Sequence, residues 1–316
     1  MLNMRKLVFL FWCLVPYALP AQAQDRTVAL TFDDLPLAGN LDGLTADAKL
    51  SEGRSVNRKI VETLRRHHAP ATAFVNEGKI VDGGHATEER AVLQEWTRYG
   101  YDLGNHTYSH ADLDKLTVDE FEKEVLEGEG SVRPLMQQAG KQLEYLRFPF
   151  NHTGETAEKH AAVADFLRQR GYEVATCTVE NSDWLFARAY RTMLDRHDTQ
   201  AARRLRAEYL IYTRKELEYF GELGKQIFGR EIPQVMLLHA NQLNADALDD
   251  VLKIFEKEGY QFVSLQQAQS DQAYRTPETD FNSFGWMWGY RWAKTLKIKV
   301  DGSKEPEVAH WIERYK

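Results

Sequence analysis

Imidazole and carboxylate side chains at two places in this chain have the types and spacing of metal ligands. His106 and His110 are four residues apart, and on one helical turn that spacing places both imidazoles on the same side. With one carboxylate they make a set of two histidines and one aspartate, which leaves positions on a metal open for water and substrate. Asp33 and Asp34 end an apolar, β-branched run and can supply that carboxylate. Together the four residues predict a catalytic divalent-metal site.

The two adjacent aspartates are expected to do different jobs. Neighbouring residues that leave a strand point in different directions, so we expect one to bind the metal and the other to lie beside the bound water. A metal lowers the pKa of its water, and a carboxylate within hydrogen-bond reach can then take the proton. The alternative is that Asp33 and Asp34 only cap the next segment, but caps seldom come as acidic pairs after such a run.

Further polar groups follow other apolar runs. Arg147 is expected near a strand end, where it needs an anionic partner because an unpaired buried guanidinium is costly, and the spare aspartate is the obvious one. A lone histidine such as His239 is more often a satisfied core residue. At the end of a strand, with Asp183 available to orient it, it becomes a candidate general acid. Asn241 either reaches the same pocket or caps the next helix.

Strand-like and helix-like segments alternate from about residue 26 to residue 270 and must position these groups. Repeated βα units predict a parallel sheet, closed into a barrel or wound open, with its chemistry at the C-terminal ends of the strands. The expected strands are Thr27–Phe32, Ala71–Asn76, Tyr101–Asn105, Tyr145–Phe150, Tyr172–Val179, Gln234–Ala240 and Gln261–Leu265. The expected helices are Arg54–His68, Glu88–Tyr99, Val118–Gln138, Glu155–Gln169 and Ala245–Glu258.

Two segments depart from this alternation, and we expect both to decorate a single domain. Residues 185–230 are charged and helical in pattern, which predicts an inserted helical hairpin, packed outside the barrel or covering one end. Residues 271–316 form a tail with clustered aromatic residues, which can make a carbohydrate platform but more often pack against the domain. The cluster comprises Phe281, Phe284, Trp286, Trp288, Tyr290 and Trp292.

Five short motifs occur in an order that resembles a known family. They are Thr31-Phe32-Asp33-Asp34, His106-x-x-x-His110, Arg147-x-Pro149-Phe150, Asp183-Trp184 and Leu237-x-His239. As an ordered set they are similar to the motifs of the NodB-homology polysaccharide deacetylases, carbohydrate esterase family 4, over roughly residues 27–270 without the insertion. The resemblance implies an α/β fold, a distorted (β/α) barrel over residues 24–270, with a divalent metal that is usually zinc.

The resemblance also implies roles for the residues around the metal. Asp33 looks like the catalytic base, and Arg147 resembles the residue that holds it. Asp34, His106 and His110 look like the metal ligands.

The remaining motif residues resemble groups that contact the substrate or the leaving group. His239 looks like the general acid, tuned by Asp183. The backbone N–H of Phe150 occupies the position that helps stabilise the oxyanion, and Trp184 looks like a wall of the acetyl pocket.

Two positions depart from the family pattern. The first motif usually continues with Gly-Pro where this chain has Leu35-Pro36, and the third usually has Gly where this chain has Asn151. Neither change removes a chemical group. Both reshape the rim where neighbouring sugars would lie, so the family's usual long polymers do not follow as substrates. His152 lies outside the motifs but close enough in sequence to Arg147 to line that rim.

The predicted function is metal-dependent removal of acetyl groups from an acetylated carbohydrate, with an N-acetyl amino sugar favoured. The motifs recognise the acetyl end, so an O-acetyl esterase or a small-amide hydrolase with the same site is the first alternative. A non-catalytic paralogue that binds glycans through the aromatic tail is the second, and it is disfavoured because every side chain that the mechanism needs is present.

The N-terminus predicts export to the periplasm or the medium. Arg5 and Lys6 precede an apolar run that ends before Ala21-Gln22-Ala23, so residues 1–23 read as a cleaved signal peptide, with an uncleaved anchor as the alternative. After removal we expect no membrane span, because no later apolar stretch is long enough. The formal charge falls from −7 to −9, which argues against nucleic acid as a partner. Cys177 then remains as the single cysteine, so no internal disulfide is expected.

Overall fold

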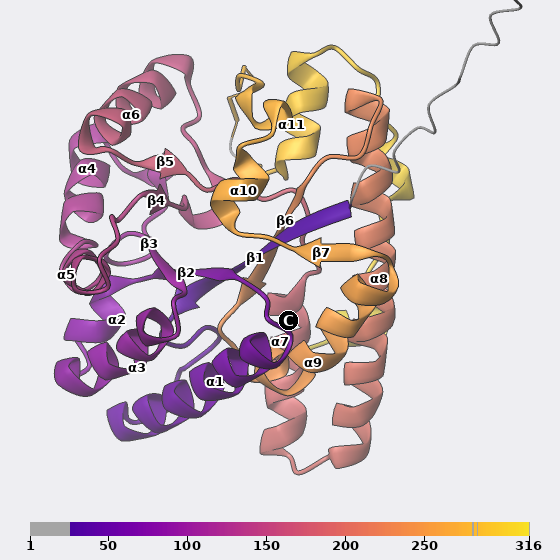
Figure 1. Ribbon diagram of the computed structural model, residues 1–316. Helices are drawn as coiled ribbons and strands as arrows, with labels where there is room; N and C mark the ends of the chain where they lie inside the picture. Colours follow the sequence, from indigo (N-terminus) through magenta and orange to yellow (C-terminus); the bar gives the residue numbers. More distant parts are fainter. Residues whose placement is uncertain (1–25, 280, 283, 316) are drawn as a thin grey trace, which may run out of the picture.

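A parallel sheet surrounded by helices forms the centre of the molecule in the computed structural model, which describes residues 26–279, 281–282 and 284–315 (Figure 1). The predicted signal peptide, residues 1–23, lies outside the described residues. The strands are β1 (Arg26–Leu35), β2 (Ala71–Val75), β3 (Asp102–Asn105), β4 (Tyr145–Leu146), β5 (Glu173–Val174), β6 (Gln234–His239) and β7 (Tyr260–Phe262).

The strand order brings the ends of distant segments together at one edge. Hydrogen-bonded neighbours run β5-β4-β3-β2-β1-β6, and β7 pairs with the beginning of β1. After β5 the chain reaches across to β6, where Val179 bridges Met236, so the sheet curls towards closure. The predicted distorted (β/α) barrel is confirmed by this arrangement.

Strands β4 and β5 are shorter than predicted. The expected strand Tyr145–Phe150 ends at Leu146, because Pro149 has no N–H to donate and Phe150 has a positive φ of 58°. The expected strand Tyr172–Val179 pairs with β4 only at its start. Beyond it, the Thr176 N–H donates to the Gln269 side chain instead of to a strand.

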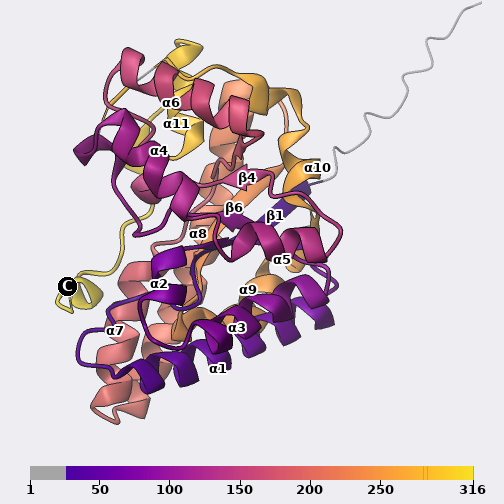
Figure 2. The same cartoon turned by 90° about the vertical axis from the view of Figure 1, so that its left-hand side faces the viewer.

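Twelve α-helices cover the described part of the sheet (Figures 1 and 2). Each predicted helix is present, although α1 begins earlier, after the Thr45 N-cap, and α2 was missed. They are α1 (Ala46–Arg66), α2 (Glu77–Val81), α3 (Ala86–Arg98), α4 (Val118–Glu127), α5 (Val132–Gln138), α6 (Ala157–Arg170), α7 (Asp183–Asp195), α8 (Thr199–Phe228), α9 (Gln242–Lys257), α10 (Leu265–Gln269), α11 (Trp288–Thr295) and α12 (His310–Glu313).

The predicted helix Val118–Gln138 is wrong in its middle, because it breaks into α4 and α5. A side chain at Gly128 would place its Cβ 2.5 Å from the Asn105 Oδ1, so only glycine lets the chain pass this close to β3. Three residues later the chain is held by Glu77, whose carboxylate accepts from the N–H and hydroxyl of Ser131.

The insertion is a helical hairpin, as predicted. Helices α7 and α8 pack against each other and against α9 on one side of the sheet, opposite α4 and α6 (Figure 1). The apolar stripe of α8 is buried, with Leu205, Tyr209 and Phe220 almost without exposure. The first turn of α7 begins at Asp183, so this hairpin starts at a predicted site residue.

Part of the aromatic tail is packed and part is exposed. Trp288 and Trp292 are buried, α11 packs on α8, and the Trp288 N–H donates to the Cys177 carbonyl. Phe284, by contrast, is 73% exposed. Helix α12 contacts α7, so the last described residues lie beside the insertion (Figure 2).

Among the described residues, no helix is long and apolar enough to cross a membrane.

Candidate metal centre and acid–base site

The end of β1 sends its two aspartates to different partners. The register between β1 and β2 shifts between Phe32 and Leu35, and Asp34 has a φ of 71°, so the carboxylates diverge. The Asp33 carboxylate is buried and accepts a hydrogen bond from Arg147 Nη1 at 3.2 Å. The Asp34 Oδ1 lies 3.6 Å from His110 Nε2. Only Asp34 therefore faces both histidines of the predicted ligand set closely enough to share an ion with them.

His106 and His110 converge through an irregular loop, and the expected helical turn between them is wrong. Thr107 and His110 both have positive φ, and no helix covers the segment. The loop is held from outside, because Asn105 Oδ1 accepts from the Thr107 N–H and Glu124 accepts from the N–H and hydroxyl of Ser109. Even so the two imidazole rings end 4.9 Å apart, as the spacing alone had suggested.

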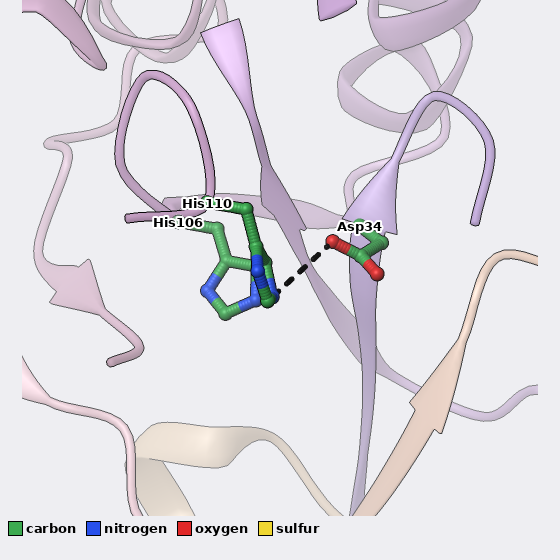
Figure 3. Close-up of side chains that lie close together, drawn as sticks. All are labelled: Asp34, His106 and His110. Atoms are coloured by element: carbon green, nitrogen blue, oxygen red, sulfur yellow. Dashed lines mark ion pairs between the residues drawn. The ribbon is translucent and has the colours of Figure 1, made fainter. Parts of the chain in front are cut away.

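Asp34, His106 and His110 form a three-ligand cluster (Figure 3). One oxygen and one ring nitrogen from each histidine lie within 4.8 Å of one another. His106 Nδ1 faces the Arg147 carbonyl at 2.8 Å, which leaves Nε2 directed towards the cluster. Among the described residues the buried Asp34 Oδ1 has no hydrogen-bond partner. A buried carboxylate oxygen opposite two imidazoles fits a divalent metal, although the Lys79 ammonium also lies 3.2 Å from that oxygen.

The protonation states of the cluster suit metal binding. Burial lowers the pKa of His106 to about 4, and burial together with the neighbouring His106 lowers the pKa of His110 to about 4. Burial alone would raise the pKa of Asp34, but the charge of Lys79 and the nearby histidines lower it overall. Near neutral pH the cluster therefore offers two neutral imidazoles and one carboxylate, the forms that bind metals.

Sequence reasoning missed Lys79. Its ammonium lies 3.2 Å from Asp34 Oδ1 and donates to the carbonyls of Asp34 and Leu37. It comes from α2, a five-residue helix that follows β2 and has no periodic pattern long enough to recognise. Lys79 therefore supplies positive charge at the edge of the cluster.

Arg147 lies inside the barrel and is anchored on several sides. It donates to Asp33, to the Thr31 hydroxyl and to the Ala175 carbonyl, and its guanidinium stands 4.6 Å from the Phe74 ring centre. Burial raises the pKa of Asp33, and the charge of Arg147 works against that rise. The guanidinium therefore keeps this buried carboxyl more acidic than its surroundings alone would make it.

His239 is oriented by a carboxylate that is itself fixed. The Asp183 Oδ1 lies 2.7 Å from His239 Nδ1, and its Oδ2 accepts from the His239 N–H at 2.8 Å and from Asn241 Nδ2 at 3.0 Å. The register pairs Asp33 with His239 across β1 and β6, so the candidate base and acid share one edge. Burial disfavours the imidazolium, but Asp183 outweighs it and raises the pKa of His239 to about 9.

A relay from the insertion to this pair was also missed from the sequence. Asn244 Nδ2 donates to both Asp183 and the His239 carbonyl, and Asn244 Oδ1 accepts from the Tyr209 hydroxyl at 2.6 Å. Asn181 in turn donates to the Tyr209 oxygen. The only available signal was that Asn244 lies one helical turn from Asn241.

A cavity of about 360 Å³ opens onto these groups. Asp34, His239, Trp184 and Asn241 line it, together with Arg188 from α7 and the 38–40 loop. Asn241 does both things left open from the sequence, because its Oδ1 also caps α9. Phe150 is not part of this lining. Its ring packs edge-on against His110 and is 53% exposed.

Comparisons with known proteins agree with this architecture. Residues 21–169 match the family model described as polysaccharide deacetylase. A peptidoglycan-N-acetylglucosamine deacetylase of Bacillus cereus is 24% identical over 255 residues, which cover 79% of this chain and 70% of that protein. Peptidoglycan-N-acetylmuramic acid deacetylase PdaA of Bacillus subtilis is 24% identical over 256 residues, or 80% of this chain and 75% of PdaA.

A solved structure shows the same fold. The crystal structure of the polysaccharide deacetylase Bc1974 from Bacillus cereus has a TM-score of 0.51 at 18% sequence identity. The similar region covers 76% of this chain and 91% of that one.

Proposed function

We propose, from the premise that this chain belongs to the polysaccharide deacetylase family, that it hydrolyses acetyl groups from an acetylated carbohydrate, with an N-acetyl amino sugar favoured. The observation that carries the proposal is that one cavity is lined both by Asp34, a member of the three-ligand metal cluster, and by His239, which Asp183 orients. Two relatives are named as peptidoglycan deacetylases. Their names support a cell-wall type of substrate and a secreted or periplasmic location for this chain.

The ion proposed for Asp34, His106 and His110 is Zn²⁺, because two imidazoles and one carboxylate are a ligand set typical of catalytic zinc. When bound, such an ion supplies a Lewis acid and makes water a better nucleophile near neutral pH. We assign its ligation to these three side chains and leave Asp33 outside the set, since Asp33 is committed to Arg147.

The side chains of this protein then move the protons. Asp33, held by Arg147, accepts a proton from the attacking water. His239, charged because Asp183 raises its pKa, donates a proton to the leaving nitrogen or oxygen. We assign stabilisation of the oxyanion to the Phe150 N–H from the motif resemblance, and the wall beside the acetyl group to Trp184, which lines the cavity. The products are acetate and a free amine or hydroxyl.

Acetate release by the purified protein tests this proposal. The protein is stripped with a chelator, reloaded with Zn²⁺ and incubated with N-acetylglucosamine oligomers, peptidoglycan and acetylated xylan in parallel. We expect metal-dependent release from an N-acetylated substrate. Release from xylan alone would identify an O-acetyl esterase.

Two variants separate the roles within the site. Asp34→Asn should lose the ion and the activity together, whereas His239→Ala should lose turnover and keep the ion. If the wild-type protein with metal bound releases no acetate from any of the three substrates, the proposal is contradicted. That result would favour a small acetylated ligand or a binding role.

A further inference from the structure

A second set of ligating side chains lies beside the candidate metal centre and takes no part in the proposed mechanism. It consists of Asp112, Asp114 and His152, each of which offers one ligand atom within 4.8 Å of the others. His152 Nδ1 lies 2.7 Å from Asp112 Oδ1 and 3.4 Å from Asp114 Oδ2. None of the three residues belongs to the five sequence motifs.

The Asp114 carboxylate is the feature that most needs a partner. Its side chain is only 8% exposed, and its carboxylate faces only the carboxyl of Glu155 and the more distant His152 ring, with no well-formed hydrogen bond among the described residues. The nearest ring nitrogen, His152 Nδ1, carries at most one proton, and it stands closer to Asp112. A buried carboxylate without a donor is costly, so a bound cation would satisfy what the protein leaves open.

The position of the cluster links two loops of the candidate active site. Asp112 and Asp114 follow His110 directly along the chain, and His152 follows Phe150. The Phe150 ring centre lies 4.7 Å from that of His110 and 5.7 Å from that of His152. The Phe150 ring therefore lies between the two clusters, and each would hold its own ion.

We propose that Asp112, Asp114 and His152 form a second divalent-cation site, which fastens the loop after His110 to the loop that carries Phe150. Two carboxylates with one imidazole suit a d-block divalent ion such as Zn²⁺ or Mn²⁺, since Ca²⁺ and Mg²⁺ prefer ligand sets made of oxygen. The Lys115 ammonium, 3.2 Å from Asp112 Oδ2, lies on a side chain that is largely exposed and free to swing into solvent. The ion would set the position of Phe150 at the rim.

Metal stoichiometry tests this site without relying on enzymatic activity. The purified protein is stripped, reloaded with Zn²⁺ or Mn²⁺, passed through a desalting column and measured by inductively coupled plasma and native mass spectrometry. We expect two ions per wild-type chain, one in Asp114→Asn, one in Asp34→Asn and none in the double variant. Asp165→Asn, which changes an exposed carboxylate on α6, is the matched control and should keep two ions.

The outcomes separate this site from the proposed catalytic one. A single wild-type ion that Asp114→Asn loses and Asp34→Asn keeps would support the second site and count against the first. A single ion that Asp114→Asn retains would overturn the second site. If Asp114→Asn does not fold by circular dichroism, His152→Gln takes its place. Two ions in both Asp114→Asn and His152→Gln would also overturn the second site.

Discussion

At the level of single residues, the same side-chain type is held in opposite protonation states within one candidate site. His106 and His110 are kept neutral mainly by burial, whereas Asp183 keeps the partly buried His239 charged. A ligand must present a lone pair and a general acid must carry a proton, so the difference suits the two roles. Composition cannot show it, because it depends on which carboxylate each imidazole faces.

The first prediction concerns the pH dependence set by Asp183. The acid form of His239 is the active one, and its pKa is raised from 6.5 to about 9, so activity is retained to higher pH and lost as the pH rises through that pKa. Asp183→Asn removes the charge that raises the pKa. We expect the alkaline limb of kcat against pH to move down by about one unit or more.

The measurement is kcat from pH 5 to 10 for the wild type and for Asp183→Asn, with Asp165→Asn as a control at an exposed carboxylate. An alkaline limb that stays in place in Asp183→Asn, while the control behaves as wild type, would show that His239 is not the acid whose titration limits the rate.

At the level of elements, the inserted hairpin contributes to the site through hydrogen bonds that lead to the Asp183–His239 pair. Tyr209 of α8 is buried and reaches the Asp183–His239 pair through Asn244. Helix α9 places Asn244 one turn from Asn241, so both amides meet the same carboxylate. An element that looked like a decoration in the sequence therefore packs against the candidate acid.

The second prediction tests that relay. Tyr209→Phe removes the hydroxyl that donates to Asn244 and leaves the ring in place. A hydrogen bond of this kind is worth about 0.5–1.5 kcal/mol, so kcat should fall by about two- to tenfold, with KM unchanged.

Tyr219→Phe is the matched control, because its hydroxyl lies on the same helix and contacts Tyr290 instead. Steady-state kinetics and urea unfolding are measured for both variants. An equal loss of kcat in the two variants would mean that α8 matters only for stability.

At the level of the whole molecule, buried acids gather where segments distant in the chain meet. Glu216 of α8 is buried, faces the Tyr212 hydroxyl and feels the charges of Glu180 and Glu305. Burial, together with this repulsion, raises the pKa of Glu216 to about 8 and that of Glu180 to about 7. The folded protein therefore keeps these acids protonated at a pH where the unfolded chain has lost the protons.

The third prediction follows from that difference in bound protons. Where the folded state binds more protons than the unfolded state, the free energy of unfolding decreases as the pH rises, here from about 4.5 to about 8. Glu216→Gln has no charge to bury, so it should be more stable than the wild type at pH 8 by about 1–3 kcal/mol, with little difference at pH 5.

Urea unfolding at both pH values measures the effect, and Glu218→Gln, an exposed site on the same helix, is the control. If the free energy of unfolding changes by the same amount between pH 5 and pH 8 in the wild type and in both variants, Glu216 does not behave as a buried acid.

Some elements of the fold could be predicted from the sequence and others could not. The alternation of strands and helices and the helical hairpin follow from hydrophobic periodicity, which is local and repeats along the chain. The break at Gly128 does not, because it is decided by the close approach of Asn105, more than twenty residues earlier. Strand β4 ends early for a similar reason, since Phe150 turns away with a positive φ.

Residue types and their order specify the groups that make the candidate site, and the βα pattern specifies a scaffold that gathers strand ends at one edge. Chemistry is carried by residue identity, and the βα alternation is carried by local pattern. The convergence of His106 and His110 through a loop and the addition of Lys79 and Asn244 to the site are features of the folded chain that no sequence pattern indicates. Those facts depend on contacts between segments far apart in the chain, and such contacts leave no periodic signal in the sequence.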